Sequence, residues 1–249
     1  MSLFISGTVF VCVFGGALLG MFLRTILPPP HLSDDSKKLI NLAIGIIATM
    51  SALVLSLLVA SAKSSYDQQK NEITEMAVKI VLLDRVLAHY GPETKDARDF
   101  LRSEVAAAIE RIWPHDTSLP PQLEPTGGLE TLYDKVQDLS PRTDAQRALQ
   151  TRAVNMLIDL GQNRILLMEQ GTNSISLPFL AVVVFSFTIC FASFSLNART
   201  NPTVVATFLL SALSIAGVIF LILEMYSPFH GLIQVSSAPV RNALSHLGR

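Results

Sequence analysis

The stretch LVLSLLVASAKSSYDQQKNEITEMAVKIVLLDRVLAHYG, from Leu53 to Gly91, decides the fold of this chain. Residues 53–62 are uncharged and mostly apolar, whereas the remainder is charged and carries apolar side chains at regular spacing. No proline, and no glycine before Gly91, interrupts the passage from one half to the other. The stretch therefore predicts one unbroken helix that begins in a membrane and continues into water.

The composition agrees with a membrane protein, because 16% of the residues are charged, against about 25% in soluble domains. Four segments contain no Asp, Glu, Lys, Arg or His, and each is long enough to cross a bilayer at about 20 residues per crossing. They are Leu3–Leu23, Leu39–Ala62, Leu177–Ala198 and Thr200–Leu223. We therefore expect an all-α membrane protein with four transmembrane helices and a long, coiled-coil-like helical insertion between the second and third.

The expected domains follow from this distribution of charge. They are residues 1–62 with transmembrane helices 1 and 2, 63–171 as a soluble helical domain of stalk hairpins, 172–224 with transmembrane helices 3 and 4, and 225–249 as a C-terminal tail. The region 63–171 contains 13 Lys or Arg and 17 Asp or Glu, a net charge of −4. This mildly acidic balance argues against nucleic acid as a partner.

Within the soluble domain, apolar side chains recur at alternating spacings of three and four residues, which is typical of a coiled-coil seam. The seam comprises Ile73, Met76, Ile80, Leu83, Leu87 and Tyr90. It closes either within the hairpin of one chain or between chains of an oligomer, and the sequence leaves both open. Gly91-Pro92 is expected to end this helix, and Ser140-Pro141 is expected to open a later long one.

The spans contain none of the groups that most membrane chemistry needs. Proton-coupled transport uses an intramembrane carboxylate or histidine, and a serine nucleophile needs a nearby base. The five histidines are isolated, the two cysteines lie in separate spans, and no glycine-rich phosphate loop occurs. We therefore expect no enzyme activity, no catalytic residue, no metal site and no cofactor.

The second span carries small and polar side chains at spacings of three or four residues, which place them on one helix face. They are Gly45, Thr49, Ala52, Ser56 and Ala60, and Lys63 and Lys70 continue the same face. Small residues allow close helix packing in lipid, and a lysine at the end of a span usually extends to the interface. Alternatively, the face lines a pore, and the two lysines form positive rings in a vestibule after subunits assemble.

Three stretches resemble the bestrophin-like family of bacterial membrane proteins, distant relatives of the bestrophin anion channels. They are LINLAIGIIATMSALVLSLLVASAKSSYDQQKNEI (39–73), LLDRVLAHYGPETKDARDFLR (82–102) and LEMYSPFHGLIQVSSAPVRNAL (223–244). The resemblance implies helical subunits around a central axis, pentameric by analogy, with the second span facing the pore and a cytoplasmic helical vestibule. It implies inorganic anions such as chloride as the permeant ions. No Phe lies within Leu39–Ala62, so the aromatic neck of bestrophins has no counterpart here.

Two functions follow as hypotheses. The first is a homo-oligomeric, anion-selective channel embedded in membrane lipid, in the bacterial inner membrane with its helical domain cytoplasmic. The second is a non-conducting scaffold or signalling adaptor whose helical domain binds a partner through the seam and the proline-rich run Pro114–Pro125. The bias of Lys and Arg at the span ends nearly ties between the two orientations.

Overall fold

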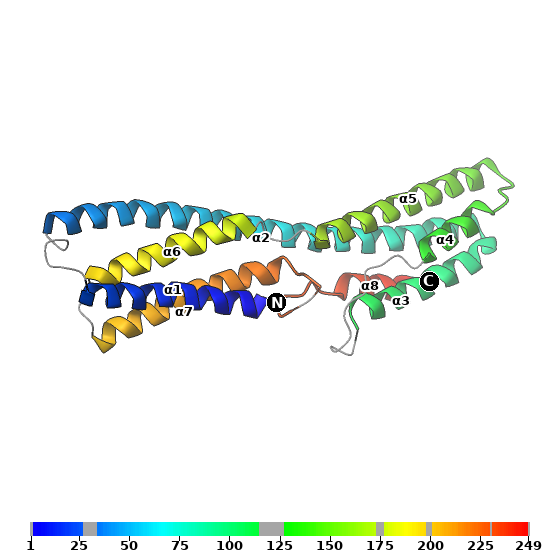
Figure 1. Ribbon diagram of the computed structural model, residues 1–249. Coiled ribbons are helices and arrows are strands. Elements are labelled where there is room, and N and C mark those ends of the chain that lie inside the picture. Colours follow the sequence, from blue (N-terminus) through cyan, green and yellow to red (C-terminus); the bar gives the residue numbers. More distant parts are fainter. Residues whose placement is uncertain are drawn as a thin grey trace. The chain divides into compact units, whose positions relative to one another are not determined.

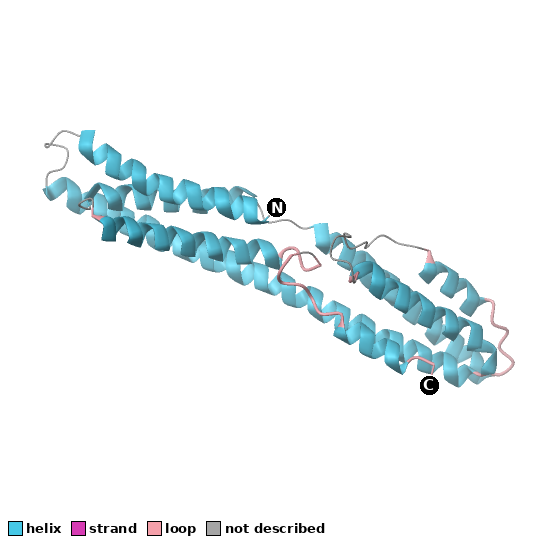
Figure 2. Ribbon diagram, turned by 90° about the horizontal axis from the view of Figure 1, so that it is seen from below, coloured by secondary structure: helices cyan, strands magenta, loops and turns pink. Residues whose placement is uncertain are grey.

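The computed structural model of the 249-residue chain describes residues 2–26, 34–114, 127–172, 177–197, 201–229 and 231–248. Within these residues it contains helices and no strand (Figures 1 and 2). The helices are α1 (Ser2–Ile26), α2 (Asp34–Tyr90), the short 3₁₀ helix η2 (Pro92–Thr94), α3 (Lys95–Ile112), α4 (Gly128–Gln137), α5 (Asp144–Thr172), α6 (Leu177–Asn197), α7 (Pro202–Met225) and α8 (Ala238–His246). The all-α prediction is thereby confirmed.

The chain folds into two compact units. The membrane unit consists of Met1–Ser65 and Ser174–Tyr226, and the helical unit consists of Tyr66–Asn173 and Ser227–Arg249. Helix α2 contributes its first part to the membrane unit and its second part to the helical unit. The predicted unbroken helix is confirmed, since α2 runs through 57 residues.

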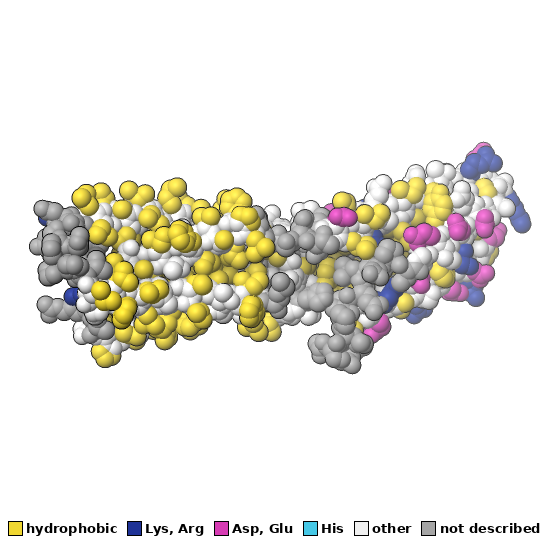
Figure 3. Space-filling view, viewed as in Figure 1, with side chains coloured by type: hydrophobic (Ala, Val, Ile, Leu, Met, Phe, Trp, Pro, Cys, Tyr) yellow, Lys and Arg dark blue, Asp and Glu magenta, His cyan; other side chains and the backbone are white. Residues whose placement is uncertain are grey.

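Four helices of the described chain are long and apolar enough to cross a membrane. The candidate spans within them begin at Ser2, Lys38, Leu177 and Pro202. Hydrophobic side chains dominate the visible surface of the membrane unit, whereas acidic and basic side chains gather on the helical unit (Figure 3). These features define an integral membrane protein with four spans, as predicted.

In the membrane unit, α1 packs against both α6 and α7. Its approach to α6 is close at the two glycines of the GALLG sequence. A Cβ added at Gly16 would lie 2.7 Å from Thr188 Cγ2, and one added at Gly20 would collide with the carbonyl oxygen of Ala192. The glycine pair therefore serves packing within one chain, where small residues let helix backbones approach in lipid.

The helical unit begins with the second part of α2, which ends at Tyr90, directly before the Gly91-Pro92 pair predicted to end it. Gly91 has φ of 140°, a conformation that side-chain-bearing residues rarely adopt, and Pro92 follows it directly. The hydroxyl of buried Thr94 donates to the carbonyl oxygens of Leu87 at 2.6 Å and Gly91 at 2.8 Å. These bonds satisfy carbonyl groups at the end of α2 and turn the chain into α3.

Helix α5 begins at Asp144, three residues after the predicted start at Ser140-Pro141. The hydroxyl of Thr143 accepts a hydrogen bond from the backbone N–H of Gln146 at 3.1 Å, while the Gln146 side chain accepts one from the N–H of Arg142. This reciprocal arrangement resembles a capping box and fixes the helix start.

The C-terminal segment folds onto the helical unit. Trp113 at the end of α3 donates its indole N–H to the carbonyl oxygen of Val235 at 2.8 Å, and its ring meets the edge of Phe229 with centroids 6.1 Å apart. Phe229 and Val235 are buried there with Ile73 and Leu167. Helix α8 then packs against α3. The tail is thus part of the core of the helical unit.

Candidate functional site

The small residues predicted on the second span lie on an exposed face of α2. Gly45, Thr49, Ala52, Ser56 and Ala60 are all exposed in the single chain. At Gly45, an added Cβ would meet no atom within 4 Å. We call these five residues the small face of α2.

A different face of α2 packs within the membrane unit. Ile44, Ser51 and Ala62 are at most 4% exposed, and Ala62 belongs to the core cluster that includes Val13 of α1 and Ile219 of α7. Spacings of seven and eleven residues put these three on one side of an α-helix, away from the small face. The chain therefore holds α2 by the face that carries these three residues and leaves the small face uncovered.

The two hydroxyls on the small face bond to the helix itself. Thr49 donates to the carbonyl oxygen of Ile46 at 2.8 Å, and Ser56 donates to that of Ala52 at 2.8 Å. Such bonds are usual for Ser and Thr within membrane helices. The face therefore presents methyl groups, glycine backbone and hydroxyl oxygens, with the hydroxyl protons already engaged.

A second exposed face of α2 consists of large apolar side chains. Ile46, Met50, Leu53 and Leu57 are each at least 60% exposed. By helical spacing they lie beside the small face, on the side away from the packed residues. A face of this kind suits lipid or a neighbouring subunit.

Lys63 and Lys70 are both exposed and continue the spacing of the small face. Asp67 lies between them, four residues after Lys63 and three before Lys70, and therefore on the same side of the helix. Asp67 was not among the predicted site residues, although its spacing from Lys63 and Lys70 places it with them. Its carboxylate reduces the positive charge that the two lysines give this turn of α2.

Glu224 at the end of α7 is a further acidic residue in the membrane unit. It is 4% exposed and accepts a hydrogen bond from the hydroxyl of Ser2 at 2.5 Å. Close by in sequence, the hydroxyls of Tyr226 and Ser61 lie 3.1 Å apart. These contacts join the beginning of α1 to the end of α7, and the middle of α2 to the residue that follows α7.

The six seam residues lie against other helices of the same chain. Ile80, Leu83 and Leu87 belong to one buried cluster with residues of α3, α4, α5 and Leu247, and Met76 packs against it. Ile73 belongs to the cluster around Phe229, and Tyr90 is 4% exposed. The proline-rich run predicted to bind a partner lies outside the described residues except for Pro114.

No group of three or more His, Cys, Asp or Glu side chains that could hold a metal ion occurs among the described residues. The candidate site is therefore described by shape and charge alone. It consists of the small face and the charged turn that follows it, both on a single helix.

Comparison with known protein families shows to which family this four-span protein belongs. The model of the Bestrophin-like domain matches residues 11–240, which include most of the first span, the other three spans and nearly the whole helical unit. The chain belongs to the bestrophin-like family. Searches among curated proteins and among solved structures gave no match.

Proposed function

We propose that this protein is a homo-oligomeric ion channel in which the small face of α2 lines the pore. The observation that carries the proposal is the exposure of Gly45, Thr49, Ala52, Ser56 and Ala60 together on one side of a membrane-spanning helix. A stripe of small residues packs closely with another helix or leaves room for a path beside it. Membership of the bestrophin-like family favours the path.

The proposed permeant ions are inorganic anions such as chloride. The hydroxyls of Thr49 and Ser56 donate to backbone carbonyls, so they supply little hydrogen bonding to a passing anion. Selectivity for anions then comes from the positive electrostatic potential of Lys63 and Lys70, which would form rings around the pore next to the segment that the small face lines. With Asp67 included, each subunit adds one net positive charge, and the ring multiplies it.

The arrangement of subunits and the orientation are part of the same proposal. Five subunits around an axis, by analogy with bestrophins, would bring five copies of α2 together. The helical units would form a vestibule in the cytoplasm, with the spans in the lipid of the bacterial inner membrane. The continuity of α2 supports this arrangement, since the wall of the narrow part would extend into the vestibule without a joint.

A non-conducting scaffold is the second candidate. It is favoured by apolar side chains on the surface of the helical unit, where Val78, Ile165 and Leu166 are each more than half exposed. Such residues suit a partner protein or a neighbouring subunit. Under this proposal the small face of α2 is a packing surface and no ion crosses.

The experiment that separates the two measures chloride efflux from liposomes reconstituted with the purified protein. The mass of the oligomer is determined from the same preparation. Efflux that scales with protein, from an oligomer of more than two subunits, supports the channel. A well-folded oligomer that releases no chloride over a range of voltage, pH and calcium concentration favours the scaffold.

A further inference from the structure

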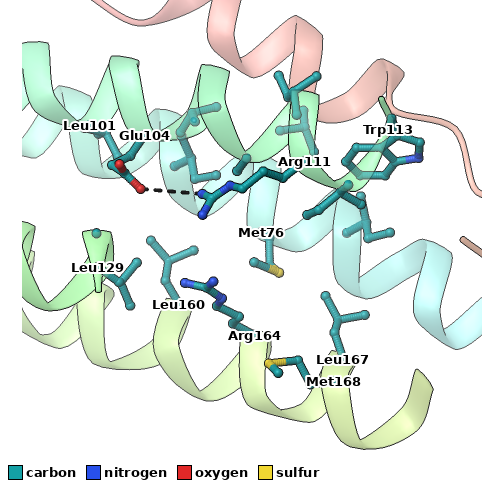
Figure 4. Close-up of a pocket in the computed structure, with 18 of the residues that line it drawn as sticks. Met76, Leu101, Glu104, Arg111, Trp113, Leu129, Leu160, Arg164, Leu167 and Met168 are labelled. Atoms are coloured by element: carbon teal, nitrogen blue, oxygen red, sulfur yellow. Dashed lines mark ion pairs between the residues drawn. The ribbon is translucent and has the colours of Figure 1, made fainter. Parts of the chain in front are cut away.

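The helical unit contains an apolar cavity of about 160 Å³ (Figure 4). Its walls come from α2, α3, α5, the beginning of α4, and the C-terminal residues Phe229 and Val240. Aliphatic side chains make up most of the wall, among them Leu160 and Leu167 of α5. All of the lining residues belong to the helical unit, so the cavity lies within one compact part of the chain.

Aromatic rings and sulfur atoms line the same cavity. Trp113 donates its indole N–H to the carbonyl oxygen of Val235 at 2.8 Å and meets the ring of Phe229 edge-on, so its position is fixed. Met76 of α2 and Met168 of α5 also line the cavity (Figure 4). Thioether sulfurs and aromatic rings both make favourable contacts with an aromatic ring, which an aliphatic molecule does not match.

The charged side chains at the cavity balance one another. Arg111 of α3 forms an ion pair with Glu104 at 3.7 Å, and Arg164 of α5 interacts with other groups of the chain. Burial and the charge of Arg111 lower the pKa of Arg164, whereas Glu130 and Glu104 raise it. Two guanidinium groups thus stand against two carboxylates. A charged ligand would lose its hydration here without gaining a partner of opposite charge.

We propose that this cavity binds a neutral aromatic molecule of about the size of benzene. The size follows from the volume, because an apolar protein cavity of about 150 Å³ accommodates benzene. The neutrality follows from the balance of charges, and the aromatic character follows from the two methionines and two aromatic rings of the wall. The proposal concerns the helical unit and holds whether or not the protein conducts ions.

Water does not account for the cavity equally well. A buried water needs about two to four polar partners, and most of the wall here is aliphatic or aromatic. The polar groups that do line it already interact within the chain, as the pair of Arg111 and Glu104 shows. An apolar molecule gains contacts with the wall and disturbs none of these interactions.

Trp113 is the single tryptophan of the chain and lines the cavity, so its fluorescence reports occupancy directly. The probes carry bromine, because a heavy atom in contact with indole quenches its emission. Bromobenzene and bromocyclohexane are matched in size and differ in aromatic character, whereas para-bromotoluene and para-bromobenzoate share the ring and differ in charge. Each probe is titrated into the full-length protein in detergent.

Quenching by a probe bound in the cavity saturates, whereas quenching by a probe dissolved in the micelle rises without a limit. We expect saturable quenching of Trp113 by bromobenzene, with bromocyclohexane binding about three-fold more weakly. We expect para-bromobenzoate to bind at least about ten-fold more weakly than para-bromotoluene, since the carboxylate would be buried without a partner.

Substitutions on α3 localise the effect. Ala108 lines the cavity, so Ala108→Phe should fill it and abolish the saturable quenching. Ala107→Phe makes the same change at an exposed position one residue away and should keep it. Size-exclusion chromatography and circular dichroism check that each variant remains folded. If Ala108→Phe does not fold, the smaller Ala108→Leu should weaken bromobenzene binding about ten-fold.

The proposal is overturned if bromobenzene causes no saturable quenching up to its solubility limit. It is also overturned if para-bromobenzoate binds as tightly as para-bromotoluene, if bromocyclohexane binds as tightly as bromobenzene, or if a folded Ala108 variant binds like wild type. Because the readout is binding in detergent, none of these results depends on chloride flux.

Discussion

Arg98 donates two hydrogen bonds to the carboxylate of Asp84, from Nε at 2.8 Å and from Nη2 at 3.0 Å. The Asp84 side chain is 1% exposed, and its Oδ2 also accepts the backbone N–H of Gly248 at 3.2 Å. One buried carboxylate thus joins α2, α3 and the C-terminal segment of the helical unit.

Removing the arginine leaves this buried charge without its partner. Arg98→Met should therefore destabilise the helical unit by about 3 kcal/mol or more. Thermal unfolding followed by circular dichroism in detergent measures the loss. Arg147→Met is the matched control, because the Arg147–Asp144 pair is exposed at 69% and 99% and should contribute less than about 1 kcal/mol. Equal losses in the two variants would contradict the role given to Asp84.

The close contact of α1 with α6 predicts that Gly20→Ala lowers stability by about 1–3 kcal/mol, because the added methyl group meets the Ala192 carbonyl and the Ser195 hydroxyl. Gly15→Ala is the control, since a Cβ at Gly15 meets nothing within 4 Å. The melting temperatures of the two variants in detergent should separate clearly. If Gly20→Ala assembles poorly while its monomer stays as stable as wild type, the glycine serves contacts between chains instead.

The buried hydroxyl of Tyr90 should make the stability of the protein depend on pH in the alkaline range. Its hydroxyl is buried with no hydrogen-bond partner among the described residues, and burial, followed by the charge of Glu93, raises its pKa. Because the folded pKa lies above the unfolded value, this group's contribution to stability is complete below about pH 10 and is lost as the pH rises further. Tyr90→Phe should stabilise the protein by about 1 kcal/mol at pH 7.

Between about pH 9 and pH 11, the range in which tyrosine ordinarily ionises, the stability of this variant should fall less than that of wild type. Unfolding by heat at a series of pH values measures both effects. Parallel curves for the two proteins would show that Tyr90 ionises as readily in the folded state as in the unfolded one.

Substitutions of the basic and the acidic residues in the charged turn of α2 should have opposite effects on ion selectivity. Lys63→Glu should reduce chloride permeability and shift the preference towards cations, whereas Asp67→Asn should strengthen the preference for anions. The reversal potential across planar bilayers under a salt gradient gives the sign. Lys95→Glu makes the same charge change at an exposed position on α3 and should leave the reversal potential unchanged.

Much of this architecture could be predicted from sequence, because its signals are local. The uncharged segments define the spans, and the absence of proline and glycine makes α2 continuous. Gly91-Pro92 marks the end of α2, because the positive φ needed at that position suits glycine. The small face of α2 is also local, because spacing on one helix fixes which residues share a side.

Other features depend on particular side-chain hydrogen bonds or on contacts between distant segments. Ser140-Pro141 offered a plausible helix start, yet hydrogen bonds between Thr143 and Gln146 set the start of α5 three residues later. The cavity unites Met76, Trp113 and Arg164 from separate elements, and no spacing in the sequence relates them. Docking of the tail through Phe229 needed a partly buried partner, Trp113, that lies more than a hundred residues away in the chain.

The central claim is that the small face of α2 lines an ion path, and cysteine accessibility tests it most directly. In a chain with Cys12→Ser and Cys190→Ala, single cysteines replace Ala52 and Ser56 on the small face or Leu53 and Leu57 on the large apolar face. Chloride efflux from liposomes is recorded before and after treatment with a charged, membrane-impermeant thiol reagent. We predict that the reagent blocks efflux through the Ala52→Cys and Ser56→Cys proteins and spares the other two. Block at Leu53 and Leu57 with none at Ala52 and Ser56 would contradict the account.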